Sequence, residues 1–358
     1  MNPRFIWKKL VPTPDPKHGK PCTRSSLGIS YIGVNDACPT ARLILHGGET
    51  VARTPLDSSQ ATWSCDLTDD DNQSWRLIPS SDPSPPPRVA HAQAYHAPSS
   101  SLYVFGGRAG ITMQEQAMND LWKLDCSGPA GSEKWSQVKT DGDTPEARSF
   151  HKMICVGDSL YVFGGCGETS GRLADMHRLD LLTHTWHSFG SSQHLRGRGG
   201  ANLLSLGSGH YLGVVAGFAG EETNDGHLFD VKEGKWRDES LTAFLEGLRP
   251  RSVCLSESFP SVGVALIFGG EVDPSAKGHE GAGSFDNSIV LLEESTGKYI
   301  DTFPNHGETW PENRGWSDGT GIDNGDGSGR LFFFGGLSGD DANPLRLDDL
   351  WALEVSKA

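Results

Sequence analysis

Residues 145–165 read PEARSFHKMICVGDSLYVFGG, and Trp186 follows 21 residues later. The pattern is a proline lead-in with an arginine, a short apolar strand, a tight Gly-Asp turn, and a second apolar strand closed by two glycines. Strand-like alternation and β-branched or aromatic residues predict β-structure on both sides of the turn. The glycine pair predicts a sharp backbone bend where neighbouring chain crowds in. This stretch therefore predicts an antiparallel unit whose fourth strand begins at the tryptophan.

The same pattern recurs six times along the chain. The glycine pairs or their equivalents are Gly47-Gly48, Gly106-Gly107, Gly164-Gly165, Gly217-Phe218, Gly269-Gly270 and Gly335-Gly336, and their closing residues are 59, 58, 53, 52 and 66 residues apart. A period near 50 with four short strands per copy is typical of β-propeller blades. We therefore predict an all-β, six-bladed propeller that forms one domain over residues 1–358.

The two ends of the chain predict how the ring closes. The last copy stops after its third strand, at Leu353. The first residues, Phe5–Leu10, resemble a fourth strand with its tryptophan, Trp7, but no earlier strands precede them. We expect this N-terminal strand to complete the last blade, because pairing the two removes open sheet edges that would invite aggregation.

Charge and cysteine content exclude some functions. The 358 residues carry a formal charge of -15, which argues against nucleic-acid binding because phosphate recognition needs a basic surface. No apolar run is long enough to span a bilayer and no secretory leader begins the chain, so no membrane partner is expected. Seven scattered cysteines without a CxxC motif predict free thiols in a reducing compartment. We expect a cytoplasmic protein.

The densest chemistry follows the fifth glycine pair. In a four-stranded blade, the residues before the first strand and after the second share one rim, so the segment 271–283 should lie at that rim. It carries Glu271, Asp273 and His279 within nine residues. Oxygen donors with one imidazole suit a divalent ion such as Fe(II) or Mn(II). The alternative is a loop whose carboxylates cap backbone N–H groups.

An arginine precedes the first strand of every copy and should reach the same rim. Guanidinium groups there can bind a sulfate, phosphate or carboxylate, which predicts a small anionic substrate. The alternative is that each arginine bonds loop carbonyls and ties the blades together. Trp316 is a candidate pocket wall, and Met113 and Gln114 are candidates for a lid, with ordinary loop packing as the alternative. The six arginines are Arg24, Arg88, Arg148, Arg198, Arg251 and Arg314.

The repeated Phe-Gly-Gly, the downstream aspartate and the spaced tryptophan resemble kelch repeats over the whole chain. A narrower set of segments resembles the plant specifier proteins of glucosinolate breakdown, namely the nitrile-specifier, epithiospecifier and thiocyanate-forming proteins. These are Fe(II)-dependent kelch propellers. The segments are Arg148–Met153, Arg198–Ala201, Gly217–Gly220, Gly269–Asp273 with Pro274 and His279, and Gly315-Trp316.

The resemblance implies specific roles. It implies an iron held by Glu271, Asp273 and His279, with Arg88 and Arg148 contacting the sulfate of the substrate and Trp316 as a pocket wall. Glu271 and His279 keep the family's separation of eight residues. The family places its aspartate four residues after the glutamate, whereas Asp273 lies two after it.

Two classes of function follow. The first is an Fe(II)-dependent, specifier-like lyase or isomerase that acts on a small anionic molecule in the central pocket, either by a glucosinolate-aglucone-type rearrangement or by a divergent isomerisation or cyclisation in secondary metabolism. The second is a non-catalytic scaffold that binds a protein partner at the rim. A copper oxidase of the galactose-oxidase type is disfavoured, because no Tyr, Cys and His ligand set is arranged for copper.

Overall fold

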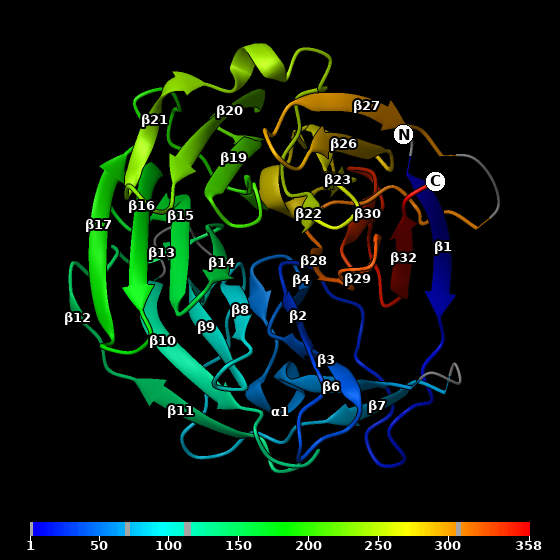
Figure 1. Ribbon diagram of the computed structural model, residues 1–358. Helices are drawn as coiled ribbons and strands as arrows, with labels where there is room; N and C mark the ends of the chain where they lie inside the picture. The colour runs from blue at the N-terminus through cyan, green and yellow to red at the C-terminus, as the bar shows by residue number, and fades with distance from the viewer. Residues whose placement is uncertain (1–2, 69–71, 111–115, 306–308) are drawn as a thin grey trace.

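The computed structural model describes residues 3–68, 72–110, 116–305 and 309–358, apart from the side chain of His279. It confirms the predicted all-β, six-bladed propeller: six antiparallel sheets surround one axis (Figure 1). The innermost strands of neighbouring blades contact one another around that axis. Each blade is twisted so that its outer strands form the side wall of the ring.

Each blade has four main strands, the first nearest the axis and the fourth on the outer wall. From the axis outward, blades one to three contain β2 (Gly28–Ile32), β3 (Ala41–His46), β6 (Trp63–Leu67) and β7 (Ser74–Leu77); β8 (Ala92–His96), β9 (Ser101–Arg108), β10 (Ala117–Asp125) and β11 (Lys134–Val138); and β14 (Lys152–Val156), β15 (Ser159–Gly167), β16 (Arg172–Asp180) and β17 (Thr185–Ser191), with β12 (Asp141–Gly142) and β13 (Arg148–Ser149) attached to the third sheet. Blades four to six contain β18 (Asn202–Leu206), β19 (Tyr211–Phe218), β20 (Glu222–Asp230) and β21 (Lys235–Ser240); β22 (Leu255–Phe259), β23 (Val264–Phe268), β26 (Ile289–Glu293) and β27 (Tyr299–Phe303); and β28 (Asp318–Asp323), β29 (Ser328–Phe334), β32 (Leu350–Ser356) and β1 (Arg4–Leu10).

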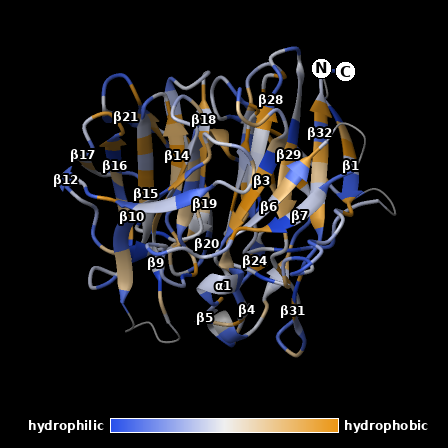
Figure 2. Ribbon diagram, turned by 90° about the horizontal axis from the view of Figure 1, so that it is seen from below, coloured by the Kyte–Doolittle hydropathy of each residue, from blue (hydrophilic) through white to orange (hydrophobic). Residues whose placement is uncertain are grey.

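Short hairpins and helical turns connect these strands. In side view, several of the hairpin strands lie together at one end of the ring, which we call the rim (Figure 2). The elements outside the main sheets are β4 (Glu49–Val51), β5 (Thr54–Pro55), β24 (Glu271–Asp273), β25 (Ser284–Phe285), β30 (Leu337–Gly339) and β31 (Pro344–Arg346), the helix α1 (Ser58–Ala61), and the 3-10 turns η1 (Thr242–Phe244) and η2 (Gly278–Glu280).

The N-terminal strand closes the last blade as predicted. β1 pairs antiparallel with β32 over seven residues, and Trp7 lies opposite Leu353. The Lys8 ammonium adds an ion pair to Glu354 at 2.8 Å. Because this pairing joins the two ends of the chain, it closes the ring and covers the edge of β32, and β1 becomes the outer strand of the sixth sheet.

The hydrophobic core is divided among the interfaces between blades. Six clusters of buried side chains each bridge two neighbouring blades. The second strand of a blade is covered on both faces, so its central residues form a continuous apolar run rather than alternating; all eight residues of β9 are buried. Burial of such strands supplies the main stabilisation of the ring.

In the third blade the glycine pair bends the second strand without ending it, whereas in blades one, five and six the second strand ends just before the pair. We expected β15 to stop at Gly165, but it continues to Gly167 across a register shift between Phe163 and Gly165. Gly164 and Gly165 have φ of +63° and +96°. A Cβ on Gly165 would approach the Ser149 carbonyl oxygen to 2.6 Å, so a side chain is excluded there.

All seven cysteines are free, as the sequence predicts. Among the described residues, no helix combines the length and apolar character needed to cross a bilayer.

Candidate functional site

A closed ring of hydrogen bonds narrows the channel below the rim. Each blade contributes the residue two positions after its rim arginine, and each of these residues has φ between 48° and 60°. In the left-handed region, the backbone N–H points to the carbonyl of the preceding blade, with N···O distances of 2.7–3.0 Å. We call this the axial ring; its members are Ser26, Ala90, Phe150, Gly200, Val253 and Trp316.

A second layer of side chains lies between the axial ring and the solvent. Its members follow the glycine pairs and form antiparallel bridges with the residue after each rim arginine. We call this the mouth layer, and it contains both acidic and basic groups as well as apolar ones: Glu49, Arg108, Cys166, Phe218, Glu271 and Leu337. In the fourth blade the equivalent pair is Ala216-Gly217, with φ of 60° and 115°, rather than the predicted Gly217-Phe218.

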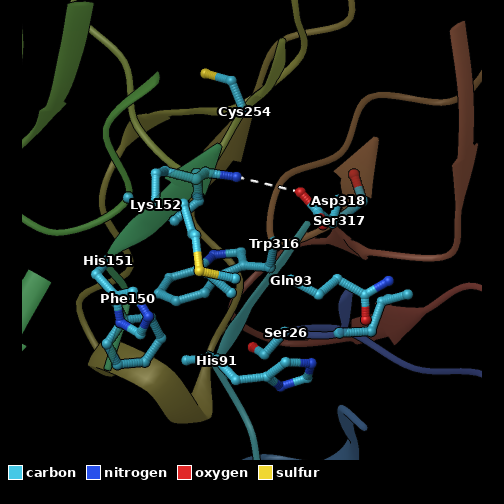
Figure 3. A pocket seen from close by; sticks show the side chains of 16 residues that line it. Ser26, His91, Gln93, Phe150, His151, Lys152, Cys254, Trp316, Ser317 and Asp318 are labelled. Carbon is cyan, nitrogen blue, oxygen red and sulfur yellow. Dashed lines mark hydrogen bonds and ion pairs between the residues drawn. The ribbon is translucent and has the colours of Figure 1, made fainter. Parts of the chain in front are cut away.

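A cavity of about 170 Å³ opens between the mouth layer and the axial ring, on the side of blades three to five. We call it the mouth cavity. Phe150 and Trp316, from opposite blades, meet edge to face at its base with ring centroids 5.6 Å apart. Trp316 therefore lines this cavity, and Figure 3 shows it beside Phe150 in the adjoining space around the axis.

One exposed cation lies at the mouth cavity. The guanidinium of Arg172, from β16, packs over the ring of Phe218 at 4.7 Å from its centroid. Within the described parts of the chain, no carboxylate is within ion-pair distance of it. Its N–H groups are therefore available to an anion, and the stacked aromatic ring would hold the guanidinium in a fixed orientation.

One carboxyl group with a raised pKa, that of Glu271, lines the same cavity, and a second, that of Glu222, bonds Ser252 in the cavity wall. Burial raises the pKa of Glu271 to about 7, against hydrogen bonds from the backbone N–H groups of Ser275 and Gly283. Glu222, on β20 of the neighbouring blade, accepts a hydrogen bond from Ser252 Oγ at 3.2 Å. Burial, together with the charge of Glu271, raises the pKa of Glu222 to about 8 despite the Ser252 hydrogen bond. A carboxyl group that titrates near neutrality can exchange a proton with a bound molecule.

The rim arginines do not face the cavity, and this corrects the expectation that they bind a ligand. All six are buried, at most 1% exposed. The Arg88 guanidinium donates to both carboxylate oxygens of Asp120 at 2.8 Å, and Arg148 does the same with Asp175. Their remaining N–H groups donate to carbonyls of the glycine pair and of the residue two positions earlier. Each guanidinium therefore ties the segment before the first strand to the second and third strands of its own blade.

The other rim arginines repeat this arrangement. Arg198, Arg251 and Arg314 pair with Asp225, Asp286 and Asp349. Arg24 differs, because its guanidinium donates to carbonyls of the first blade and to the sulfur of Cys22. Sequence reasoning missed these aspartate partners, although the aspartate recurs downstream of each arginine from blade two onward, and that joint recurrence is the signal of a pair.

The predicted metal ligands do not converge as a set. Glu271 points into the cavity, but the side chain of Asp273 is 70% exposed and contacts Arg249 at 3.4 Å. A register shift between Glu271 and Asp273 in the β24–β25 hairpin turns Asp273 away. His279 lies in η2, and its side chain is outside the described residues. Among the described residues, no cluster of three or more His, Cys, Asp or Glu side chains could hold a metal. Asp273 therefore does not fit an iron site.

Another carboxylate reaches this loop from the sixth blade. Ser275 occupies the position four residues after Glu271, and its hydroxyl donates to Asp341 Oδ1. Asp341 Oδ2 accepts from the N–H of Ala276 at 3.1 Å. The charge of Asp341 also raises the pKa of Glu271, so the two carboxyl groups are close enough to interact. The predicted lid residues Met113 and Gln114 lie outside the described residues.

Comparison with known proteins agrees with this architecture. A family model described as "KLHDC2/KLHL20/DRC7 Kelch-repeats domain" matches residues 35–270. The chain is similar to the N-(sulfonatooxy)prop-2-enimidothioate sulfolyase of Thlaspi arvense, with 27% identity over 87% of this chain and 86% of that protein.

Other relatives are longer proteins. Host cell factor 2 of Homo sapiens is 28% identical over 45% of this chain, and Adagio protein 3 of Arabidopsis thaliana is 32% identical over 64% of it. The matches span 20% and 37% of those two proteins. A solved structure titled "Structure of YjhT" superposes with a TM-score of 0.63 at 16% identity, covering 92% of this chain and 95% of that one, which shows a shared fold.

Proposed function

This chain belongs to the KLHDC2/KLHL20/DRC7 type of kelch-repeat family, and we propose that the mouth of its propeller carries a lyase-like activity on a small anionic molecule. The observation that carries the proposal is the mouth cavity itself, where the available Arg172 guanidinium and the Glu271 carboxyl line one space. A volume of about 170 Å³ is below the roughly 300–1,000 Å³ of drug-sized pockets, so the substrate is small. The similar sulfolyase of Thlaspi arvense supports an anionic leaving group.

Each group has a separate role in this proposal. Arg172 binds the anionic group and stabilises it as it departs with the bonding electron pair. Glu271, protonated in a fraction of molecules near neutral pH, donates a hydrogen bond or proton to a developing negative charge. Phe150 and Trp316 exclude water, which strengthens both interactions. In this proposal, Arg172 takes the anion-binding role that the sequence assigned to Arg88 and Arg148.

We expect Arg172→Met to lower kcat/KM about 10- to 100-fold, because a charge-assisted hydrogen bond contributes about 1.5–3 kcal/mol. The measurement is sulfate release from N-(sulfonatooxy)prop-2-enimidothioate, the compound in the name of the Thlaspi arvense relative. The matched control is Arg178→Met on the same strand, because Arg178 packs over Phe189 outside the cavity. Wild-type turnover no faster than the buffer reaction, or full activity in Arg172→Met, would contradict the proposal.

Fe(II) bound at the mouth is the second part of the proposal. Glu271 supports it and Asp273 does not. Asp341 is the carboxylate that bonds Ser275, the residue at the position of the missing aspartate four residues after Glu271. Bound there with His279 as a further ligand, the ion would supply a Lewis acid. We expect protein prepared anaerobically with Fe(II) to keep less iron after Glu271→Ala or Asp341→Asn, and an unchanged amount after Asp273→Asn. Equal iron in wild type and in a Glu271→Ala, His279→Ala double variant would exclude this site.

Protein binding at the rim is a second candidate function. Val51 and Leu345 are exposed on rim hairpins of the first and sixth blades, and the Arg346–Glu49 ion pair at 3.4 Å joins those hairpins. Exposed apolar side chains on a rigid rim are suited to a peptide or protein partner. If the rim binds a partner, a Val51→Asp, Leu345→Asp variant should lose peptides enriched from a displayed library. Leu182→Asp, on the turn between β16 and β17, should keep them; no enrichment by wild type would count against this function.

A further inference from the structure

The channel widens again on the far side of the axial ring. A cavity of about 600 Å³ lies there, lined by the innermost strands of all six blades, and we call it the lower cavity. Its size falls within the roughly 300–1,000 Å³ of small-molecule sites. Gln93, Lys152 and Asp318 line both this cavity and the space next to the axial ring, so they form its inner end (Figure 3).

A donor and an acceptor face each other at that inner end. Lys152 from blade three reaches Asp318 from blade six, with Nζ and Oδ1 3.3 Å apart (Figure 3). Asp318 Oδ2 accepts a hydrogen bond from the N–H of Ile29 at 3.2 Å, which fixes the carboxylate. Both side chains are roughly one-quarter exposed, at 24% and 22%, so their remaining hydrogen-bonding capacity faces the channel. An ammonium and a carboxylate side by side can each bond one of two neighbouring hydroxyl groups.

A buried amide adds an unused acceptor. Gln93 is 7% exposed, and its Nε2 donates to Ser30 Oγ and to the Ile44 carbonyl. Its Oε1 has no hydrogen-bond partner among the described residues. Because an unpaired buried acceptor is costly, this oxygen is suited to receive a hydrogen bond from a bound molecule.

The charge of the lining argues against an anion. Lys152 is already balanced by Asp318. The oxygens of Glu257 accept the backbone N–H groups of Ser258 and Gly321 at 2.9 and 2.6 Å, and burial raises its pKa. Beside apolar side chains such as Ile154 and Leu204, the wall also offers hydroxyl groups and two half-buried tyrosines: Ser30, Ser205, Ser256, Thr320, Tyr31 and Tyr95.

We propose that the lower cavity binds a neutral polyhydroxylated molecule of the sugar or polyol class. Lys152 and Asp318 bond neighbouring hydroxyl groups, Gln93 Oε1 accepts from a third, and the tyrosines contact the apolar face of the ring. The site lies on the other side of the axial ring from the mouth cavity and does not depend on the proposed lyase activity.

The test uses D-glucose, maltose and myo-inositol as probes, with citrate as the anionic comparison. Binding to the full chain is measured by saturation-transfer NMR and calorimetry. We expect at least one of the three to bind saturably with a Kd of about 1 mM or tighter. Ser256→Phe, which places a bulky ring inside the cavity and leaves the hydrogen bonds of Lys152 and Gln93 in place, should weaken binding. Lys152→Met should weaken it about tenfold, and Arg172→Met at the mouth should leave it unchanged.

Several results would overturn the proposal. The first is that none of the three probes binds saturably below about 10 mM. The second is that the Ser256→Phe variant binds a probe as tightly as wild type does. The third is that citrate binds and the neutral probes do not. Weaker binding in Arg172→Met would assign the ligand to the mouth cavity and would also overturn it. Circular dichroism of each variant confirms that loss of binding is not loss of folding.

Discussion

Replacing Arg148 with methionine is expected to lower the free energy of unfolding by about 3–5 kcal/mol, because removing one partner of a buried ion pair leaves the other charge unpaired. Arg148 is fully buried and donates to both oxygens of Asp175 at 2.8 Å. It also donates to the carbonyls of Gly164 and Glu146, which the substitution leaves without that donor. Urea denaturation followed by fluorescence measures the loss.

A double-mutant cycle separates the ion pair from the packing of the side chain. Asp175→Asn should lower the free energy of unfolding less in the Arg148→Met background than in wild type. In that background Asp175 is already an unpaired, partly buried charge, and the substitution removes it. Arg172→Met is the matched control. Because its guanidinium is exposed, this substitution should change the free energy of unfolding by no more than about 0.5 kcal/mol. If Arg148→Met kept the stability of wild type and lost only activity, Arg148 would be a substrate-binding residue after all.

The architecture could be predicted because its signals are local and repeated. The tight turn at Gly157, the glycine pair and the strand-four tryptophan each lie within one copy of the pattern, and six copies reinforce one another. Closure of the ring followed from the same reasoning, because the last copy lacks a fourth strand and the N-terminal strand around Trp7 supplies it. Boundaries were less accurate: β15 continues past its glycines, since a bulge can bend a strand without ending its hydrogen bonds.

The site was harder to predict because its contacts join distant segments. Arg148 and its partner Asp175 lie on different strands, so sequence alone left the choice between a ligand and a structural partner open. The alternation of a strand places Glu271 and Asp273 on the same face, but a one-residue register shift reverses that. Arg172 could not be distinguished from other surface arginines, because its significance comes from Phe218, which belongs to the next blade.

The carboxyl pair at the mouth predicts an unusual dependence of stability on pH. Glu271 and Glu222 have pKa values raised to about 7 and about 8 in the folded protein, against 4.5 for an ordinary glutamate. The folded state therefore holds protons that the unfolded state releases between about pH 4.5 and 8. Stability then falls as the pH rises through this window, because the unfolded state binds fewer protons than the folded state.

Glu271→Gln and Glu222→Gln should each remove one such contribution. Relative to wild type, the free energy of unfolding of each variant is expected to rise by about 1–3 kcal/mol between about pH 5 and pH 8.5. The reason is that deprotonation of the replaced carboxyl group destabilises wild type and cannot occur in the variant. The change of this stability difference with pH is the informative result. The loss of a hydrogen-bond acceptor oxygen in each variant lowers stability by about the same amount at every pH. Glu146→Gln is the control: hydrogen bonds from the Thr169 and Ser170 segment lower the pKa of Glu146 despite burial, so this group is ionised in both the folded and unfolded states across this range. The stability difference between Glu146→Gln and wild type should therefore not change with pH there. Denaturant midpoints across the range measure all three. Profiles of Glu271→Gln and Glu222→Gln that run parallel to wild type would show that neither carboxyl holds a proton near neutrality, and Glu271 could not then supply one to a substrate.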